Sequence, residues 1–280
     1  MKNILTIDFE DWYQDLNFNC WNSFEDRLFQ NTTRLLSILN KKKSTATFFI
    51  LGYNALRFPS IIETIIENGH EIAVHGYNHL DLTNQQPSEF EQDLTETLHI
   101  LKNICKEKIE CFRAPYFSLT QNTSWILDIL KNHDIKYDSS IFPVKTPLYG
   151  VPDAPQFPYY ICSNNITRKS DSKEIFEFPI STIKLSCFNR NIPIGGGFFL
   201  RFFPYKFIKI AIQLIHKQQQ PAIFYFHPWE LDHLQPKISS YKWWKYYNLN
   251  NSEKKFKKLL DDFDFISIRD YLEVKNNNLL

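Results

Sequence analysis

The chain has 280 residues, of which 43% are hydrophobic and 22% are charged, so it can bury a large core, and this excludes wholesale disorder and a fibrous structure. The 32 Lys and Arg residues nearly balance the 31 Asp and Glu residues, and a formal net charge of +1 gives no global attraction for nucleic acid or for an anionic membrane. The length fits one large domain, and we expect a single domain over residues 1–280.

The cysteines and the N-terminus predict a cellular location. The cysteines are widely spaced and form no C-x-x-C pair, so we expect reduced thiols in a cytoplasmic protein. The N-terminal segment reaches Asp8 before any apolar stretch of signal-peptide length, and Arg201, Lys206 and Lys209 interrupt the most apolar stretch, residues 198–215. We therefore expect no transmembrane segment. The cysteines are Cys20, Cys105, Cys111, Cys162 and Cys187.

Short apolar runs alternate along the chain with longer helical patterns, which is typical of a parallel sheet with crossover helices. In the first half, we predict strands at residues 3–8, 45–52, 70–75, 110–114 and 135–139. The predicted helices between them are residues 31–41, 59–68, 87–104 and 123–133.

Residues 141–168 interrupt this alternation, because prolines recur there among aromatic side chains and predict a long, ordered excursion. The pattern then resumes. We predict strands at 175–182, 222–227 and 265–268, and helices at 204–217 and 252–263. About seven strand-helix units predict an α/β fold, a distorted (β/α) barrel in one domain.

Acidic, imidazole and guanidinium side chains follow separate predicted strands. The carboxyl ends of barrel strands meet on one face, where the following loops build the active site, so we expect these side chains to share one pocket. They are Asp8, Glu10 and Asp11 after the first strand, His75 and His79 after the third, Arg113 after the fourth and His227 near the last.

The spacing of His75 and His79 suits a metal site. A helical turn would place both imidazoles on one side about 6 Å apart, close enough to bind one metal ion, although an isolated H-x-x-x-H is also typical of exposed loop histidines. In an extended segment Asp8 and Glu10 point the same way and Asp11 points opposite, so Glu10 is the expected third ligand and Asp11 the alternative. An acidic loop that caps the following segment is the competing interpretation.

Two further motifs place charged groups at strand ends. Arg113 would hold a nearby Asp ionised and oriented, although an isolated Arg more often forms a surface salt bridge. Beside a metal site His227 is a candidate general acid, whereas a lone histidine after an apolar strand is usually a core residue. Trp12, Phe117 and Trp229 flank these motifs and could stack on sugar rings, or serve as core or rim aromatics.

These motifs, in this order, resemble those of the polysaccharide deacetylases, the nodulation-protein-B homology domain of carbohydrate esterase family four. The resemblance runs from about residue 3 to residue 271. The motif D-x-E-D-W, the glycine run at 195–197 before Phe198 and the motif H-P-W-E resemble the subgroup associated with exopolysaccharide and surface-glycan clusters. The family's usual adjacent Asp-Asp pair is replaced here by Asp8-Phe9-Glu10-Asp11.

The resemblance implies a divalent metal, usually zinc, held by His75, His79 and an acidic residue that is either Glu10 or Asp11. It also implies an N-deacetylase, a hydrolase that removes the N-acetyl group of an amino sugar in a polysaccharide or a glycan precursor. We expect that substrate to be a precursor of a bacterial surface glycan, processed in the cytoplasm or at the inner face of the membrane. The stretch 198–209 could contact lipid or could belong to a barrel loop and helix.

For the reaction, the resemblance implies Asp8 as the general base, Arg113 as its orienting partner, the Tyr116 backbone N–H as an oxyanion donor and His227 as the general acid. Two alternatives stay open: a hydrolase of the same architecture that acts on a non-sugar amide, and a catalytically inactive carbohydrate-binding barrel. A glycosidase is less favoured, because Glu230 is the nearest candidate for a second carboxylate opposite Asp8.

Overall fold

The structure is a computed structural model that describes residues 1–146, 149–184 and 190–277. The chain folds into two compact units. Unit 1 comprises Met1–Phe48, Ser60–Glu71 and Ile194–Leu280, and unit 2 comprises Phe49–Pro59 and Ile72–Pro193. The single domain expected over residues 1–280 remains a prediction.

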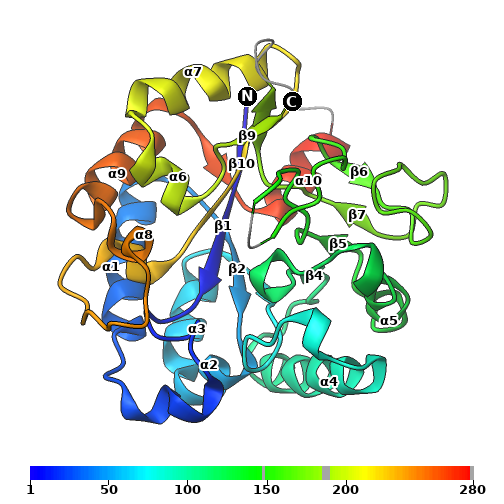
Figure 1. The fold of residues 1–280 in the computed structure, drawn as a ribbon, viewed down its shortest axis with the longest axis horizontal. Coiled ribbons are helices and arrows are strands. Elements are labelled where there is room, and N and C mark those ends of the chain that lie inside the picture. Colours follow the sequence, from blue (N-terminus) through cyan, green and yellow to red (C-terminus); the bar gives the residue numbers. More distant parts are fainter. Residues whose placement is uncertain (147–148, 185–189, 278–280) are drawn as a thin grey trace. The chain divides into compact units, whose positions relative to one another are not determined.

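Unit 1 is built around the strand β1 (Asn3–Phe9), which is buried along its whole length. This strand pairs in parallel with β10 (Ile223–Phe226) and with β11 (Phe265–Ile266), and Figure 1 shows β1 and β10 next to each other. All residues of β1 are buried, as in a strand that is covered on both faces. The register pairs Ile7 with Phe226, so Asp8, near the end of β1, and His227, directly after β10, lie at the same edge of the sheet.

The helices of unit 1 pack their apolar faces inward. The first of them, α1 (Leu28–Lys42), begins earlier than the predicted start at residue 31. The cause is a distant side chain, because the Asp11 carboxylate accepts hydrogen bonds from the backbone N–H groups of Arg27 and Leu28. The others are α3 (Pro59–Glu67), α6 (Gly197–Phe202), α7 (Tyr205–His216), α8 (Trp243–Tyr246), α9 (Ser252–Asp262) and α10 (Ile268–Asn276).

Unit 2 carries the rest of the parallel strands. The strand β2 (Thr47–Ile50) contributes its first half to unit 1 and its second half to unit 2, and the strand order in unit 2 is β2-β3-β4-β5-β7-β6. The pairs β3–β4, β4–β5 and β5–β7 are parallel, and β6 pairs with β7 in the antiparallel direction. These strands are β3 (Glu71–Val74), β4 (Cys111–Phe112), β5 (Tyr137–Asp138), β6 (Tyr159–Tyr160) and β7 (Phe176–Glu177).

The helices of unit 2 are α2 (Gly52–Arg57), α4 (Pro87–Ile104) and α5 (Ile126–Asn132), and its strands β8 (Thr182–Lys184) and β9 (Asn191–Pro193) pair as an antiparallel ladder. Helix α4 has the predicted bounds, because Pro87 opens it and Glu89 closes a capping box with the Gln86 backbone. The α/β fold predicted from the alternation of strands and helices is confirmed.

Some predicted elements are wrong in detail. The single strand expected at 175–182 is divided between β7 and β8, and the sequence did not indicate α2, α6, α8, α10, β6 or β9. These elements are short or lie at the edge of a unit, where a few residues give little periodicity. The excursion at 141–168 contains β6, and Pro147 within it lies outside the described residues.

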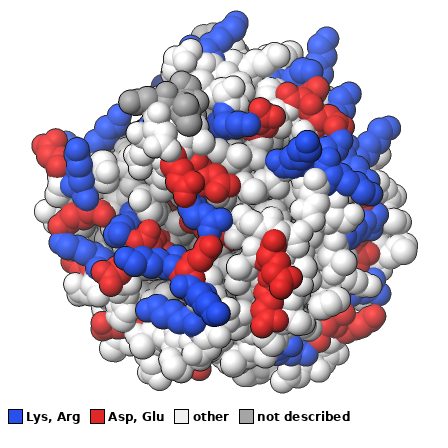
Figure 2. All heavy atoms as spheres, turned by 180° about the vertical axis from the view of Figure 1, so that it is seen from behind, with Lys and Arg blue, Asp and Glu red and all other residues white. Residues whose placement is uncertain are grey.

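The surface charges and the thiols agree with the composition. Figure 2 shows basic and acidic side chains interspersed on the face that it displays. Within the described residues, no helix has the length and apolar character needed to cross a membrane. Cys20, Cys105, Cys111 and Cys162 are thiols that form no disulfide within the described residues, and Cys187 lies outside those residues.

Candidate functional site

The carboxyl ends of β1 and β10 bring three titratable side chains together in unit 1. Asp8, Glu10 and His227 each offer one donor atom, and these atoms lie within 4.8 Å of one another. His227 Nε2 lies 3.8 Å from Asp8 Oδ2. Both carboxylates are buried, so their charges act on the imidazole with little screening by water.

Asp11 has a different role from its acidic neighbours. Its Oδ1 accepts a hydrogen bond from the Trp12 backbone N–H at 2.7 Å, and its Oδ2 accepts from those of Arg27 at 2.6 Å and Leu28 at 2.9 Å. Burial raises the pKa of Asp11 to about 6, although these N–H groups favour the ionised form. The carboxylate therefore serves as the cap of α1, which is the competing interpretation offered for this acidic segment.

A buried chain of hydrogen bonds supports His227. Its Nδ1 lies 2.9 Å from Glu230 Oε1, and Glu230 Oε2 accepts a hydrogen bond from Arg201 Nε at 2.9 Å. Both Glu230 and Arg201 are 1% exposed, so each needs the other to remain charged. Burial would raise the pKa of Glu230, but the charge of Arg201 and the contacts with His227 lower it overall.

The same chain sets the protonation of the imidazole. Burial alone would lower the pKa of His227, but the hydrogen bond to Glu230 and the negative charges of Glu10, Glu230 and Asp8 outweigh it and raise this pKa. In the protonated imidazole both ring nitrogens donate. Nδ1–H then points to Glu230, and Nε2–H lies on the side of Asp8, as a general acid requires.

The glycine run at 195–197 makes room for this network. A Cβ atom on Gly197 would lie 2.0 Å from Glu230 Oε1, and one on Gly196 would lie 2.6 Å from the Tyr225 ring. No side chain fits at these distances, so the backbone at the start of α6 approaches the Glu230 carboxylate only if residue 197 is glycine. Sequence reasoning noted the run only as a family resemblance and did not connect it with Glu230.

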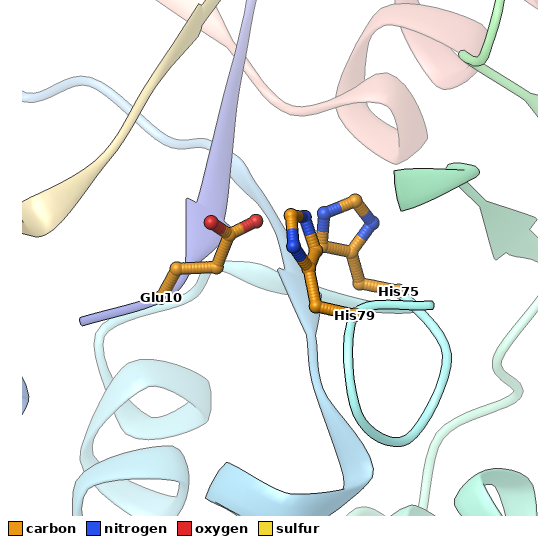
Figure 3. Close-up of side chains that lie close together, drawn as sticks. All are labelled: Glu10, His75 and His79. Carbon is orange, nitrogen blue, oxygen red and sulfur yellow. The ribbon is translucent and has the colours of Figure 1, made fainter. Parts of the chain in front are cut away.

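In unit 2, His75 and His79 lie side by side, with ring centroids 5.2 Å apart (Figure 3). They lie on a loop after β3 and not on a helical turn, because Gly76 and His79 have φ angles of 76° and 57°. The helical turn expected from the H-x-x-x-H spacing is therefore wrong. Helix α4 holds the loop, since Asp93 accepts two hydrogen bonds from the Tyr77 backbone N–H at 3.0 and 3.1 Å.

The tautomer of His75 is set by the backbone. Its Nδ1 lies 2.7 Å from the Arg113 carbonyl oxygen. A carbonyl only accepts hydrogen bonds, so Nδ1 carries the proton and Nε2 carries the lone pair that a metal ion needs. A ligating histidine typically donates its other ring N–H in this way.

Arg113 and Tyr116 occupy the next strand end of unit 2. The Arg113 side chain is fully buried, and its Nε and Nη2 donate to the carbonyl oxygen and the hydroxyl of Ser139 at 2.8 and 2.7 Å. Its guanidinium also lies 4.2 Å from the centroid of the Phe49 ring. Tyr116 has a left-handed φ of 57°, and its ring centroid lies 4.3 Å from that of His79.

The three aromatic residues expected to contact sugar are buried. Trp12 is 1% exposed, Phe117 6% and Trp229 5%. The Trp229 ring stacks on His227 with centroids 5.1 Å apart, and the ammonium of Lys245 lies 3.9 Å from its centroid. These environments are those of core aromatics, and they leave little ring face open to a sugar.

Three buried side chains carry the donor atoms that zinc prefers. Glu10 offers a carboxylate oxygen, and His75 and His79 offer imidazole nitrogens (Figure 3). Because the Asp11 oxygens are engaged by backbone N–H groups, Glu10 is the acidic residue of this segment with the better chemistry for a ligand. By donor type alone, one carboxylate and two imidazoles match the ligands found in catalytic zinc sites.

Comparison with known proteins agrees with this chemistry. Residues 19–138 match the family model of the polysaccharide deacetylases, and residues 139–273 match a domain of unknown function, DUF3473. Residues 19–138 thus carry a match to the polysaccharide deacetylase family, and the resemblance stated from the motifs is confirmed. The surface-glycan subgroup stays a prediction.

Curated relatives match part of the chain. A peptidoglycan-N-acetylglucosamine deacetylase of Bacillus cereus is 33% identical over 91 residues, which are 32% of this chain and 33% of the relative. A chitooligosaccharide deacetylase of Bradyrhizobium is 29% identical over 92 residues, which are 32% of this chain and 42% of the relative. The matched segment thus spans less than half the length of each relative.

Solved structures show the same fold. The crystal structure of a protein from Mycobacterium smegmatis, titled a putative polysaccharide deacetylase, superposes with a TM-score of 0.61 at 18% identity, covering 100% of this chain and 92% of the other. A variant of the peptidoglycan deacetylase PdaC from Bacillus subtilis superposes with a TM-score of 0.50 at 15% identity, covering 99% and 93%. At this identity the likeness concerns the fold alone.

Proposed function

We propose that this protein is a metal-dependent N-deacetylase that removes the acetyl group of an amino sugar in a polysaccharide or a glycan precursor. The observation that carries the proposal is the cluster of Asp8, Glu10 and His227, whose imidazole contacts the buried Glu230, a contact that raises the pKa of His227. A paired base and acid beside metal-binding side chains suit the hydrolysis of an amide, which needs an activated water and a proton for the departing amine.

We propose Glu10, His75 and His79 as the ligands of one divalent ion, most simply zinc. Their burial, the tautomer of His75 and the use of Asp11 as a helix cap support this set. When bound, such an ion lowers the pKa of water and polarises the acetyl carbonyl.

The side chains of this protein have the following roles in the proposed reaction. Asp8 accepts the proton of the attacking water, and Arg113 orients that carboxylate. The Tyr116 backbone N–H donates a hydrogen bond to the oxyanion of the tetrahedral intermediate. His227 gives its Nε2 proton to the sugar nitrogen as the C–N bond breaks, and Glu230 keeps the imidazole oriented and charged.

The substrate class and the location are part of the proposal. The relatives named above act on peptidoglycan and chitooligosaccharides according to their names, which supports an N-acetylated glycan as the substrate. We propose a precursor of a bacterial surface glycan, deacetylated in the cytoplasm or at the inner face of the membrane.

Release of acetate tests the function. The purified chain, loaded with zinc or cobalt, is incubated with chitooligosaccharides and with peptidoglycan fragments. We expect acetate from at least one of them, loss of both metal and activity in His75→Ala, and no loss in the matched control His99→Ala, whose imidazole is exposed on α4. Cleavage of a non-sugar amide alone would support the alternative hydrolase. A chain that binds no metal and is unaffected by His75→Ala would be an inactive carbohydrate-binding protein.

A further inference from the structure

Two carboxyl groups that the proposed mechanism does not use face each other in the core of unit 2. Asp138 and Glu177 end the neighbouring parallel strands β5 and β7, and the register pairs them directly. Directly paired residues project from the same face of a sheet, so their side chains are neighbours. Asp138 is 1% exposed and Glu177 is 0% exposed, so water screens neither group.

One oxygen of each carboxyl group has a donor, and the other does not. Asp138 Oδ1 accepts from the Ser140 hydroxyl, and Glu177 Oε1 accepts from the Ile141 backbone N–H at 3.0 Å. Asp138 Oδ2 and Glu177 Oε2 are buried, and no N–H or hydroxyl donor of residues 1–146, 149–184 and 190–277 reaches them. The two carboxyl groups stand at directly paired positions of β5 and β7 and interact electrostatically with each other. Two ionised carboxylates at these positions would repel each other and would lack a donor for these oxygens, whereas one retained proton removes one charge and supplies a donor.

The groups that surround the carboxyl pair balance a single negative charge. The guanidinium of Arg113, at the end of β4, interacts electrostatically with both carboxyl groups. From β6 the pair faces Tyr159, a neutral phenol whose hydroxyl donates to the Ile166 carbonyl oxygen. One cation and one anion balance in this buried space, whereas two carboxylates would leave a net charge there.

The segment after Asp138 connects the pair to the site. The Ser139 hydroxyl accepts from Arg113 Nη2, and the Ser140 hydroxyl accepts from the Ala114 backbone N–H at 2.8 Å while it donates to Asp138. Both the guanidinium and the backbone that leads to Tyr116 are thus tied to the strand end at which the carboxyl pair lies.

We propose that Asp138 and Glu177 form a carboxyl pair that shares one proton, and that its single negative charge positions Arg113 for the reaction, a role that rests on the proposed function. The two are positioning residues, because they act through Arg113. Burial and the neighbouring Asp138 raise the pKa of Glu177 well above its ordinary value, which agrees with a proton retained at neutral pH.

The proton itself is tested without turnover. Infrared spectra of the folded chain at pH 8 are compared with those of Asp138→Asn, Glu177→Gln and the exposed control Glu174→Gln. At this pH Asp11 and Asp93, whose pKa values are raised to about 6, are ionised. We expect a carboxylic-acid C=O band in the wild type and in the control that is absent from both single variants. A wild type without this band, or a band that survives both substitutions, overturns the pair.

The positioning role is tested with the active, metal-loaded chain. In each single amide variant the new N–H group donates to the remaining carboxylate and one negative charge stays beside Arg113. In the double variant no charge remains. We expect the double variant to lose about 100-fold in kcat, the cost of a misplaced catalytic group, with a much smaller loss in each single variant and little change in KM. Losses that simply multiply overturn the role of the charge. Failure of the wild type to release acetate would refute the proposed function and leave the infrared result intact.

Discussion

Substituting Glu10 and Asp11 one at a time separates metal binding from helix capping. Asp11→Ala removes the acceptor of three backbone N–H groups, those of Trp12, Arg27 and Leu28. A buried donor left without a partner costs about 1–3 kcal/mol, and a lost N-cap about 0.5–2 kcal/mol. Removing the buried charge recovers part of this cost, so we expect the free energy of unfolding to fall by about 2–4 kcal/mol.

The pH dependence has a definite sign. Because the pKa of Asp11 is raised from 3.8 to about 6 in the folded chain, the group stabilises the fold fully below pH 3.8, and this contribution is lost as the pH rises through 6. The difference in unfolding free energy between the wild type and Asp11→Ala should therefore be larger at pH 5 than at pH 8. Urea unfolding of the metal-free chain at the two pH values measures it.

Glu10→Gln is the matched substitution, and it should behave in the opposite way. It removes a charged ligand but no helix cap, so we expect zinc affinity to fall by at least about 100-fold and the stability of the metal-free chain to change by less than about 1 kcal/mol. Zinc affinity is measured by competition with a chelator. The reasoning is refuted if Asp11→Ala weakens zinc binding as much as Glu10→Gln does while the unfolding free energy stays at the wild-type value.

Three more outcomes are expected from the network behind His227. Glu230→Gln removes the hydrogen-bonded charge that raises the pKa of His227, so the alkaline limb of the pH profile of kcat/KM should move to lower pH; an unmoved limb would exclude His227 as the general acid. Gly197→Ala places a Cβ against the Glu230 carboxylate, so it should shift the alkaline limb in the same direction and lower the free energy of unfolding by about 1–3 kcal/mol. A variant with wild-type stability and a wild-type pH profile would contradict the close approach of residue 197 to Glu230. Arg201→Met leaves Glu230 buried without its cation, so thermal unfolding should show a fold destabilised by about 3–5 kcal/mol. A loss of stability under about 1 kcal/mol would contradict a stabilising role for this ion pair.

Much of the fold followed from local patterns. The apolar run of β1 and the bounds of α4 depend on periodicity, Pro87 and a capping box, all of which act between residues a few positions apart. Alternation along an extended segment also placed Asp8 and Glu10 on one side, and the structure groups them with His227. The family could be identified for the same reason, because its motifs are short and each lies at one strand end.

Other features were decided by residues far apart in the sequence. Asp11 caps α1 because the chain returns to it at residues 27 and 28, and Gly197 is required because Glu230 lies against it. The pairing of Asp138 with Glu177 depends on the register of two strands separated by the long excursion. Tertiary structure alone determines such contacts, because helix propensity and residue spacing describe only neighbours along the chain. The burial of a side chain, the tautomer of a histidine and the sharing of a proton depend on which distant groups the packing brings together.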